Sequence, residues 1–387
     1  MKKRIVILTA IYFCILFASD SMADMGEINI GGFISQGFLQ TSENNYLADT
    51  HDGSAQFNEM GIYFKTSLPG NLRIGVQFFG RDLGEVGNNE FGMNWAFAEK
   101  KWSEVFGIRA GLIKTPFGLY GETRDMDMLR TSIFLPSSVY NEWFRDANQS
   151  FNAIEFFGNI NLGAAGTLQY QVADGETSVS EDSGTALFYK DVTGYLTDVS
   201  KFTVGNLLVG ALTWLSPIDG FRVKGYYTHT EFEMDGIFAG MNIPVVLNVS
   251  EAEYFIFSAE YILGDFLFAT EYSTTIIKSE ILSSGSVLIP ETETETQGYY
   301  VNISYRINEK LVFGTYFADN KNDKDAKGLS NRLKDIAVSA KYDISDNWIA
   351  KVECHKMQGL FGVQPEKTGG SMDEDWYLYA AKLTYFF

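Results

Sequence analysis

Hydrophobic and polar positions alternate with a period of two at the carboxyl end of the chain, from Trp376 to Phe387. One face of this segment carries Tyr377, Tyr379 and Leu383, and the chain ends on a phenylalanine. An exposed aromatic edge strand invites aggregation in water, whereas a closed barrel pairs that edge with its first strand and buries the aromatic face in lipid. We therefore predict a membrane β-strand here; the alternative is an edge strand of a soluble protein.

The same period recurs along the chain in segments of roughly ten residues. Seven short turns separate these segments, at 69–71, 101–104, 161–166, 216–220, 263–265, 308–310 and 345–347. Eight longer connections alternate with the turns, at 41–55, 82–90, 115–150, 174–203, 234–249, 281–296, 320–330 and 359–374. The pattern predicts an all-β fold, a transmembrane antiparallel β-barrel of about sixteen strands. Poor alternation over 91–100 and 151–160 leaves about fourteen or eighteen strands as alternatives.

Proline positions agree with these boundaries. All seven prolines fall within the predicted turns and connections, where a missing backbone donor interrupts no strand ladder. The run Glu291–Thr296, with its alternating glutamate and threonine, is expected to be the solvated end of a connection.

The amino terminus has the pattern of a cleavable export signal. A basic start is followed by an apolar run over 5–18, and the small residues Ser21 and Ala23 occupy the positions that a signal peptidase requires. We expect residues 1–23 to be removed and residues 24–387 to form the barrel. The apolar run is shorter than the roughly 20 residues of a membrane-spanning helix.

Composition changes this interpretation little. Loss of Lys2, Lys3, Arg4 and Asp20 with the signal takes the basic residues from 30 to 27 and the acidic residues from 49 to 48, and so the formal charge from −19 to −21. Such a charge makes nucleic acid an unsuitable partner. Mean hydropathy is −0.07, yet the chain has 37 Gly, 21 Tyr and 31 Phe, which favours a barrel with aromatic girdles.

The third connection, residues 115–150, is too apolar for a loop that extends into water. Phe117, Phe134, Tyr140 and Trp143 are among its large hydrophobic residues, so we expect it to pack inside the barrel.

Motifs of this connection resemble a known family. The runs Pro116–Tyr120, Glu122–Asp125 and Ile133–Pro136, followed by Val139 and Tyr140, are similar to those of porin-like outer-membrane proteins of Gram-negative bacteria. The resemblance implies a passive diffusion channel for small hydrophilic solutes in the outer membrane, with the third loop folded into the lumen. It also implies a homotrimer in contact with lipid and lipopolysaccharide, and recognition of Phe387 by the barrel assembly machinery.

Charged residues in and near this connection are the candidate site. We predict a pore constriction lined by Arg73, Arg81, Arg109, Lys114, Glu122, Arg124, Asp125, Asp127, Arg130 and Arg145. Opposed charges across a narrow lumen create a transverse field that favours polar solutes. Two alternatives remain open: Arg124 and its neighbours only hold the loop against the wall, or Arg73, Arg81 and Arg109 select phosphate or carboxylate solutes.

Other functions have less support in the sequence. The chain has three histidines and no G-x-S-x-G motif, so we expect no enzyme. Asp319, Asn320 and Asp323 lie among lysines, so we expect no metal site and no cofactor. A plugged barrel acting as an adhesive surface protein is a further alternative, although glycines such as Gly61 and Gly75 on predicted lumen faces favour an open one.

Overall fold

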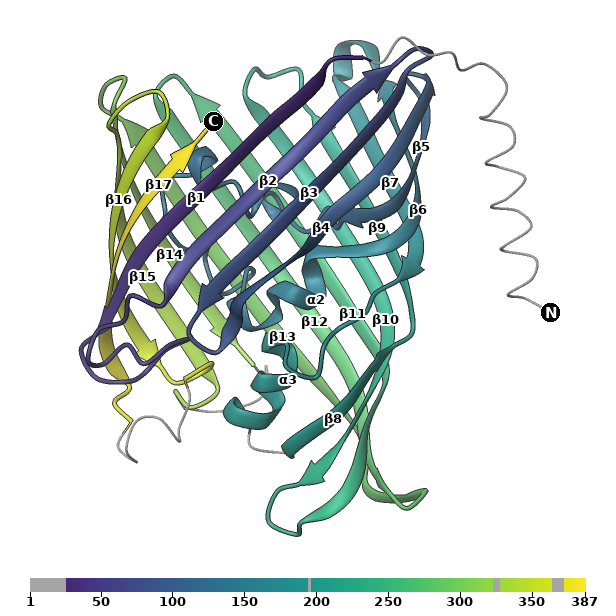
Figure 1. Ribbon diagram of the computed structural model, residues 1–387, viewed down its shortest axis with the longest axis vertical. Helices are drawn as coiled ribbons and strands as arrows, with labels where there is room; N and C mark the ends of the chain where they lie inside the picture. Colours follow the sequence, from purple (N-terminus) through teal and green to yellow (C-terminus); the bar gives the residue numbers. More distant parts are fainter. Residues whose placement is uncertain (1–25, 194–195, 323–327, 364–371) are drawn as a thin grey trace, which may run out of the picture.

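The structure, a computed structural model, describes residues 26–193, 196–322, 328–363 and 372–387. The predicted export signal and its cleavage site lie outside these residues. The described chain forms one closed antiparallel barrel, in which β1 (Ile28–Thr41) pairs with both β2 (Phe57–Leu68) and β17 (Asp375–Phe386) (Figure 1). The predicted terminal strand is confirmed, and it closes the barrel as expected, with Phe386 opposite Phe33.

The remaining strands follow in chain order. They are β3 (Leu72–Leu83), β4 (Val86–Ser103), β5 (Phe106–Lys114), β6 (Ser150–Asn161), β7 (Thr167–Glu176), β8 (Leu196–Val204), β9 (Asn206–Leu215), β10 (Phe221–Phe238), β11 (Ile243–Leu263), β12 (Phe266–Ser283), β13 (Ser286–Arg306), β14 (Leu311–Lys321), β15 (Arg332–Asp343) and β16 (Trp348–Gly359). The short helices are α2 (Arg145–Gln149) and α3 (Gly184–Leu187), the π-turn Phe188–Val192, and the 3-10 turns Gly121–Thr123, Asp127–Leu129, Glu142–Phe144 and Gly163–Ala165.

The sheet has seventeen strands by hydrogen bonding, but β8 and β9 act as one. Only Gly205 separates them, and both pair antiparallel with β10, β8 through Phe232–Phe238 and β9 through Arg222–His229. The Gly205 amide donates to the Glu231 carbonyl at 2.8 Å, so the ladder continues through the interruption. The barrel therefore has sixteen strands around its wall, as the alternation predicted.

The two faces of the wall have opposite chemistry. Outward positions carry exposed apolar side chains such as Ile34, Phe257 and Val338, whereas inward positions carry buried polar ones such as Glu59 and Lys351. This distribution is the reverse of that in a water-soluble protein and fits a barrel whose outer face contacts hydrocarbon. Within the described part of the chain, no helix has the length and apolar character needed to cross a membrane.

All seven predicted short turns are present, and together they define the turn end of the barrel. Gly70 (φ 77°) and Asn71 (φ 59°), for example, supply the positive dihedral angles that a tight hairpin between β2 and β3 requires. The opposite end, where the longer connections lie, is the loop end (lower side of Figure 1).

Four predicted long connections are wrong in length, because strands continue through them; in one of them, 174–203, β7 extends to Glu176 and β8 begins at Leu196. The predicted 82–90 and 281–296 connections are tight hairpins at Gly84 and at Ser284–Gly285, and 234–249 contracts to residues 239–242. As a result β10 to β13 extend beyond the rest of the wall at the loop end (Figure 1).

The placement of two prolines and of the acidic run is corrected for the same reason. Pro244 lies in β11 and pairs on one side only, with Ile237. Pro290 lies in β13 at an irregularity of the β12–β13 register, where it has no paired residue, so neither missing donor costs a ladder bond. Glu291–Thr296 belongs to β13 and is not a loop end. Pro365 lies outside the described residues.

Candidate functional site

Residues 115–150 connect β5 to β6 and contact the inward face of the wall at three places. We call these residues the inner segment. Its two ends meet where the Thr115 amide donates to the Gln149 carbonyl at 3.1 Å. In Figure 1, α2 of this segment lies among the strands at mid-height.

The first contact is with β10 to β13. The buried carboxylate of Glu271 accepts hydrogen bonds from the Leu119 amide (3.0 Å) and the Tyr140 hydroxyl (2.5 Å) of the segment. It also accepts from the wall hydroxyls of Ser258 (2.6 Å) and Tyr300 (2.7 Å). Four donors on one carboxylate fix this part of the segment firmly, since hydrogen bonds to a charged group are the stronger kind.

The second contact is with β16 and β17. Asp127 accepts from the Lys351 ammonium at 2.9 Å and from the Thr384 hydroxyl at 2.9 Å, and its carboxylate lies 3.6 Å from the Lys382 ammonium. Burial alone raises the pKa of Asp127, but Lys351 and Lys382 outweigh it and hold that pKa well below its usual range. Glu353 adds to this contact by accepting from the Ile133 amide at 2.7 Å.

The third contact is with β2 and β3. Arg145 donates to Glu59 at 2.7 Å, and Arg81 donates to Glu142 at 2.8 Å. Arg124, within the segment, donates to the same Glu142 carboxylate at 2.8 Å. Burial raises the pKa of Glu142, but Arg124, Arg145 and Arg81 outweigh it and hold that pKa well below its usual range.

The structure divides the predicted constriction residues into two groups by exposure. Five have buried side chains, each in an ion pair: Arg81, Arg124, Asp125, Asp127 and Arg145. The other five reach solvent: Arg73 and Glu122 are exposed, and Arg109, Lys114 and Arg130 are partly exposed. Arg73 is the most open of the ion-paired residues in this set, with 46% of its side chain accessible.

The solvent-facing group is concentrated toward the turn end. Arg73 and Arg109 share the Glu99 carboxylate at 2.9 and 2.7 Å, and Arg109 also lies 3.1 Å from Glu155. Arg73, Glu99, Arg109 and Glu155 thus form a row across β3, β4, β5 and β6 in which positive and negative side chains alternate. Glu122 of the inner segment faces the neighbouring β7, where the Gln171 amide lies 3.5 Å from its carboxylate.

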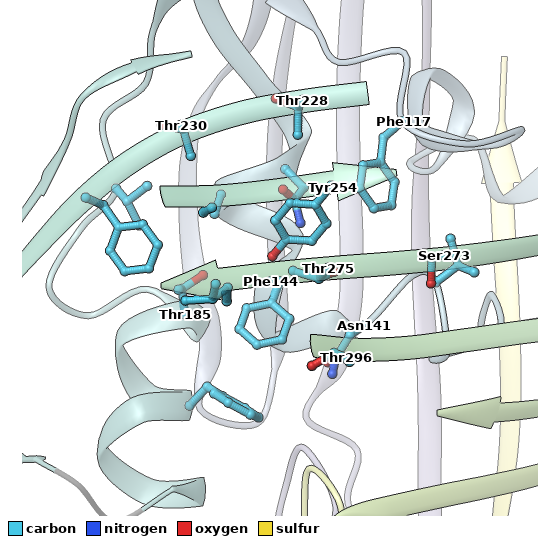
Figure 2. A pocket seen from close by; sticks show the side chains of 18 of the residues that line it. Phe117, Asn141, Phe144, Thr185, Thr228, Thr230, Tyr254, Ser273, Thr275 and Thr296 are labelled. Atoms are coloured by element: carbon cyan, nitrogen blue, oxygen red, sulfur yellow. The ribbon is translucent and has the colours of Figure 1, made fainter. Parts of the chain in front are cut away.

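A cavity lies on the other side of the inner segment, against β8 to β14 (Figure 2). Sequence analysis missed its wall residues because no charge marks them. Thr228 and Thr230 on β10, and Ser273 and Thr275 on β12, stand two positions apart and point into it. The signal available in the sequence was the spacing of these residues, since two hydroxyl side chains two positions apart lie on one face of a strand.

Two of the histidines lie beside carboxylates of the wall. His355 is held between Asp335 (3.0 Å) and Glu353 (2.8 Å), and His229 lies 3.8 Å from Glu253. Across the described ranges, no group of three or more His, Cys, Asp or Glu side chains is arranged to hold a metal ion. Asp319 instead pairs with Arg332, and Asp323 lies outside the described residues.

Several solved structures share this fold. Outer-membrane expressed OmpT of Vibrio cholerae has a TM-score of 0.61 at 10% identity, covering 94% of this chain and 98% of that one. Salmonella typhi OmpF in complex with daunomycin has a TM-score of 0.60 at 15% identity, with the same coverage. An anion-selective porin from Comamonas acidovorans has a TM-score of 0.58 at 12% identity, covering 94% of this chain and all of that one. In vitro folded Vibrio cholerae OmpT also has a structure described as a trimer form.

Comparison of sequences gives the family. No curated protein sequence matches the chain, but the family model for Gram-negative porins matches residues 8–359. The match spans most of the barrel and agrees with its sixteen strands, its apolar outer face and its polar interior. The chain therefore belongs to the Gram-negative porin family and is a diffusion channel of the bacterial outer membrane.

Proposed function

We propose that the inner segment, residues 115–150, forms the constriction of this channel, and that small hydrophilic solutes and ions pass between the segment and the wall. The observation that carries the proposal is the attachment of the segment at three places around the wall, through Glu271, Asp127 and Glu142. A chain so held narrows the lumen permanently, because each attachment is a buried, charge-assisted contact.

Exposure assigns two different roles to the predicted constriction residues. The solvent-facing residues set the charge of the passage: Arg73, Arg109, Lys114, Glu122 and Arg130. The buried residues position the segment: Arg81, Arg124, Asp125, Asp127 and Arg145. A charge that is paired and shielded from water contributes little to the field that a passing ion meets.

Mixed selectivity follows, in preference to selection of phosphate or carboxylate solutes. Of the three arginines that could form a basic filter, Arg81 is buried between Glu142 and Asp146. Arg73 and Arg109 share Glu99, so the row at the turn end carries little net positive charge.

The assembly and the absence of catalysis belong to the same proposal. A homotrimer is supported by the apolar outer face and by the trimer form of Vibrio cholerae OmpT. Phe387 is 57% exposed and continues the pairing of β17 with Gly32, which suits recognition by the barrel assembly machinery in a membrane with lipopolysaccharide. The family favours a channel over an enzyme.

Planar-bilayer recording of the purified mature chain in a salt gradient tests the proposal. We expect discrete conductance steps and a small reversal potential that reports the mixed charge. A folded barrel that inserts but conducts no current would overturn the open channel and favour a plugged surface protein.

A further inference from the structure

The cavity beside the inner segment combines aromatic rings with hydroxyl and amide groups. Phe117 and Phe144 from the segment and Tyr254 from β11 present rings to it, and the hydroxyl groups of Thr228, Thr230 and Thr275 line the same cavity (Figure 2). Further hydroxyl and amide groups come from Ser137, Ser138, Asn141, Thr177, Thr185, Ser273, Thr296, Asn320 and Asn322. The cavity therefore offers apolar faces and many hydrogen-bonding groups within one space.

Charge is almost absent from this lining. Arg124 is the one charged side chain among the described lining residues, and its guanidinium is already occupied. It donates to the Glu142 carboxylate at 2.8 Å and to the carbonyl of Tyr140 at 2.8 Å, and only 8% of its side chain is accessible. An ionic solute finds no free counter-charge here, whereas the row at Arg73 presents a partly exposed, though paired, guanidinium.

The rings are held in place by their neighbours. Phe117 packs edge-on against Tyr226 with ring centroids 5.3 Å apart, and its ring centroid lies 6.3 Å from that of Tyr254. Phe144 packs against Phe188 at 4.7 Å. Fixed rings offer a binding surface without the entropic cost of ordering them, which favours a ligand with flat apolar faces.

Two buried polar atoms of the lining lack a partner. The Ser138 hydroxyl and the Asn320 side-chain oxygen are inaccessible and form no hydrogen bond, in side chains that are 6% and 5% exposed. Buried polar groups are normally paired, so these two oxygens are unsatisfied groups beside the cavity, and a small rotation of either side chain would bring its oxygen to a bound ligand. A solute hydroxyl has both the donor and the acceptor needed for these two oxygens.

We infer that this cavity is a binding subsite for neutral polyhydroxylated solutes, of the carbohydrate class, at the loop-end entrance to the constriction. The C–H faces of a sugar ring pack on Tyr254 and Phe144, and its hydroxyls bond to the threonine, serine and asparagine groups around them. The inference rests on the proposed constriction, because the subsite lies on the loop-end side of the segment that narrows the lumen. A purely apolar ligand would leave the accepting oxygens of the lining hydroxyls unused, and a charged one would lack a counter-ion.

Blockade of ion current by maltotriose tests this inference in the same bilayer experiment. Steps must first be seen without sugar; their absence refutes the channel itself. With steps present, we expect added maltotriose to reduce the current in a saturable way at millimolar concentrations. Citrate, at equal concentration, should block much less. Steps that maltotriose leaves unchanged at 100 mM, or equal blockade by both solutes, would overturn the subsite while leaving the channel intact.

Variants locate the blockade. Tyr254→Ala should weaken the apparent maltotriose affinity about threefold to tenfold, the range of one aromatic contact. Thr275→Val keeps the shape of the side chain and should weaken affinity about threefold, because it removes one hydrogen-bonding hydroxyl. Phe257→Ala, on the lipid-facing side of the same strand as Tyr254, is the matched control and should leave the blockade unchanged. Equal affinity in all four proteins would place the sugar elsewhere.

Discussion

The inner segment separates two very different parts of the same lumen. Toward β2, β3, β16 and β17 the interior is filled with ion pairs, such as Asp127 with Lys351 and Arg145 with Glu59, and these side chains are shielded from water. Toward β10 to β14 the cavity beside the segment has a nearly uncharged lining, and the carboxylate of Glu271 holds the segment next to it. Charge inside this barrel therefore has two uses: buried charge fixes the segment, and exposed charge acts on solutes.

The largest expected effect comes from removing Asp127. Asp127→Ala leaves the Lys351 ammonium buried without its carboxylate. It also removes one of the two carboxylates near the buried Lys382 and the carboxylate beside the partly exposed Arg130. Breaking a buried ion pair in this way costs roughly 3–5 kcal/mol. We expect a loss of this order in the free energy of unfolding, measured by urea titration of the barrel in detergent, together with noisier open-channel current as the segment loosens.

Glu122→Ala is the matched control for that variant, because it removes an exposed carboxylate from the same segment. It should change the unfolding free energy by less than about 1 kcal/mol. Equal losses in the two variants would show that exposure does not separate the two uses of charge.

Glu271→Gln should have a smaller but clear effect on the opposite attachment. The amide replaces one accepting oxygen by a donor that faces the Tyr140 and Tyr300 hydroxyls or the Ser258 hydroxyl and the Leu119 amide. A buried group left without its partner costs about 1–3 kcal/mol. Urea titration checks this loss, and an unchanged unfolding curve would contradict the role of Glu271 as an anchor.

The wall of the barrel could be predicted from the sequence wherever each strand had lipid on one side and polar groups on the other. The weak alternation over 91–100 has a physical cause in β4: the register shifts between Gln77 and Phe78, which skips Asn94 and reverses the faces. Over 151–160 the inward positions of β6 are partly apolar, because Phe151 packs against the inner segment. The sequence predicted a loop at the β12–β13 hairpin because this hairpin extends beyond the rest of the wall at the loop end.

The roles of the charged residues could not be predicted in the same way. Asp127 and Lys351 are 224 residues apart, and Glu59 and Lys382 are 323 apart, so nothing local in the sequence pairs them. The ten candidate residues were found by their charge, but their division into buried and exposed depends on how the segment lies in the lumen. The cavity went unnoticed because threonine and serine at a spacing of two occur in many strands.

Acid should remove the stability contributed by the buried ion pairs of Asp127 and Glu142 only at low pH. Neighbouring cations hold the pKa of both Asp127 and Glu142 well below its usual range in the folded protein. In the unfolded chain the pKa is about 3.9 for an aspartate and about 4.3 for a glutamate. The stabilisation from these ion pairs is therefore complete above those pKa values, and it is lost as the pH falls through the pKa values of the folded protein. The stability difference between the wild type and Glu142→Gln should therefore stay constant from about pH 8 to pH 5 and shrink below about pH 4. Urea titrations across that range measure it, and a decline centred near neutral pH would contradict the assignment.

The smallest expected effect on stability, and the sharpest on transport, comes from the exposed charges at the turn end. Arg73→Gln removes a cation whose side chain is 46% accessible, so the reversal potential in a salt gradient should move toward cation preference. Glu122→Gln removes an exposed anion and should move it in the opposite direction. Both should leave the unfolding free energy within about 1 kcal/mol of the wild type, since exposed ion pairs contribute little.

Arg124→Gln is the buried counterpart: it should lower stability by removing the guanidinium that pairs with Glu142, and change selectivity less than Arg73→Gln. If Arg124→Gln moved the reversal potential more than Arg73→Gln did, the paired charge of Arg124 at the edge of the cavity would be acting on passing ions, and the division into buried and exposed charges would be contradicted.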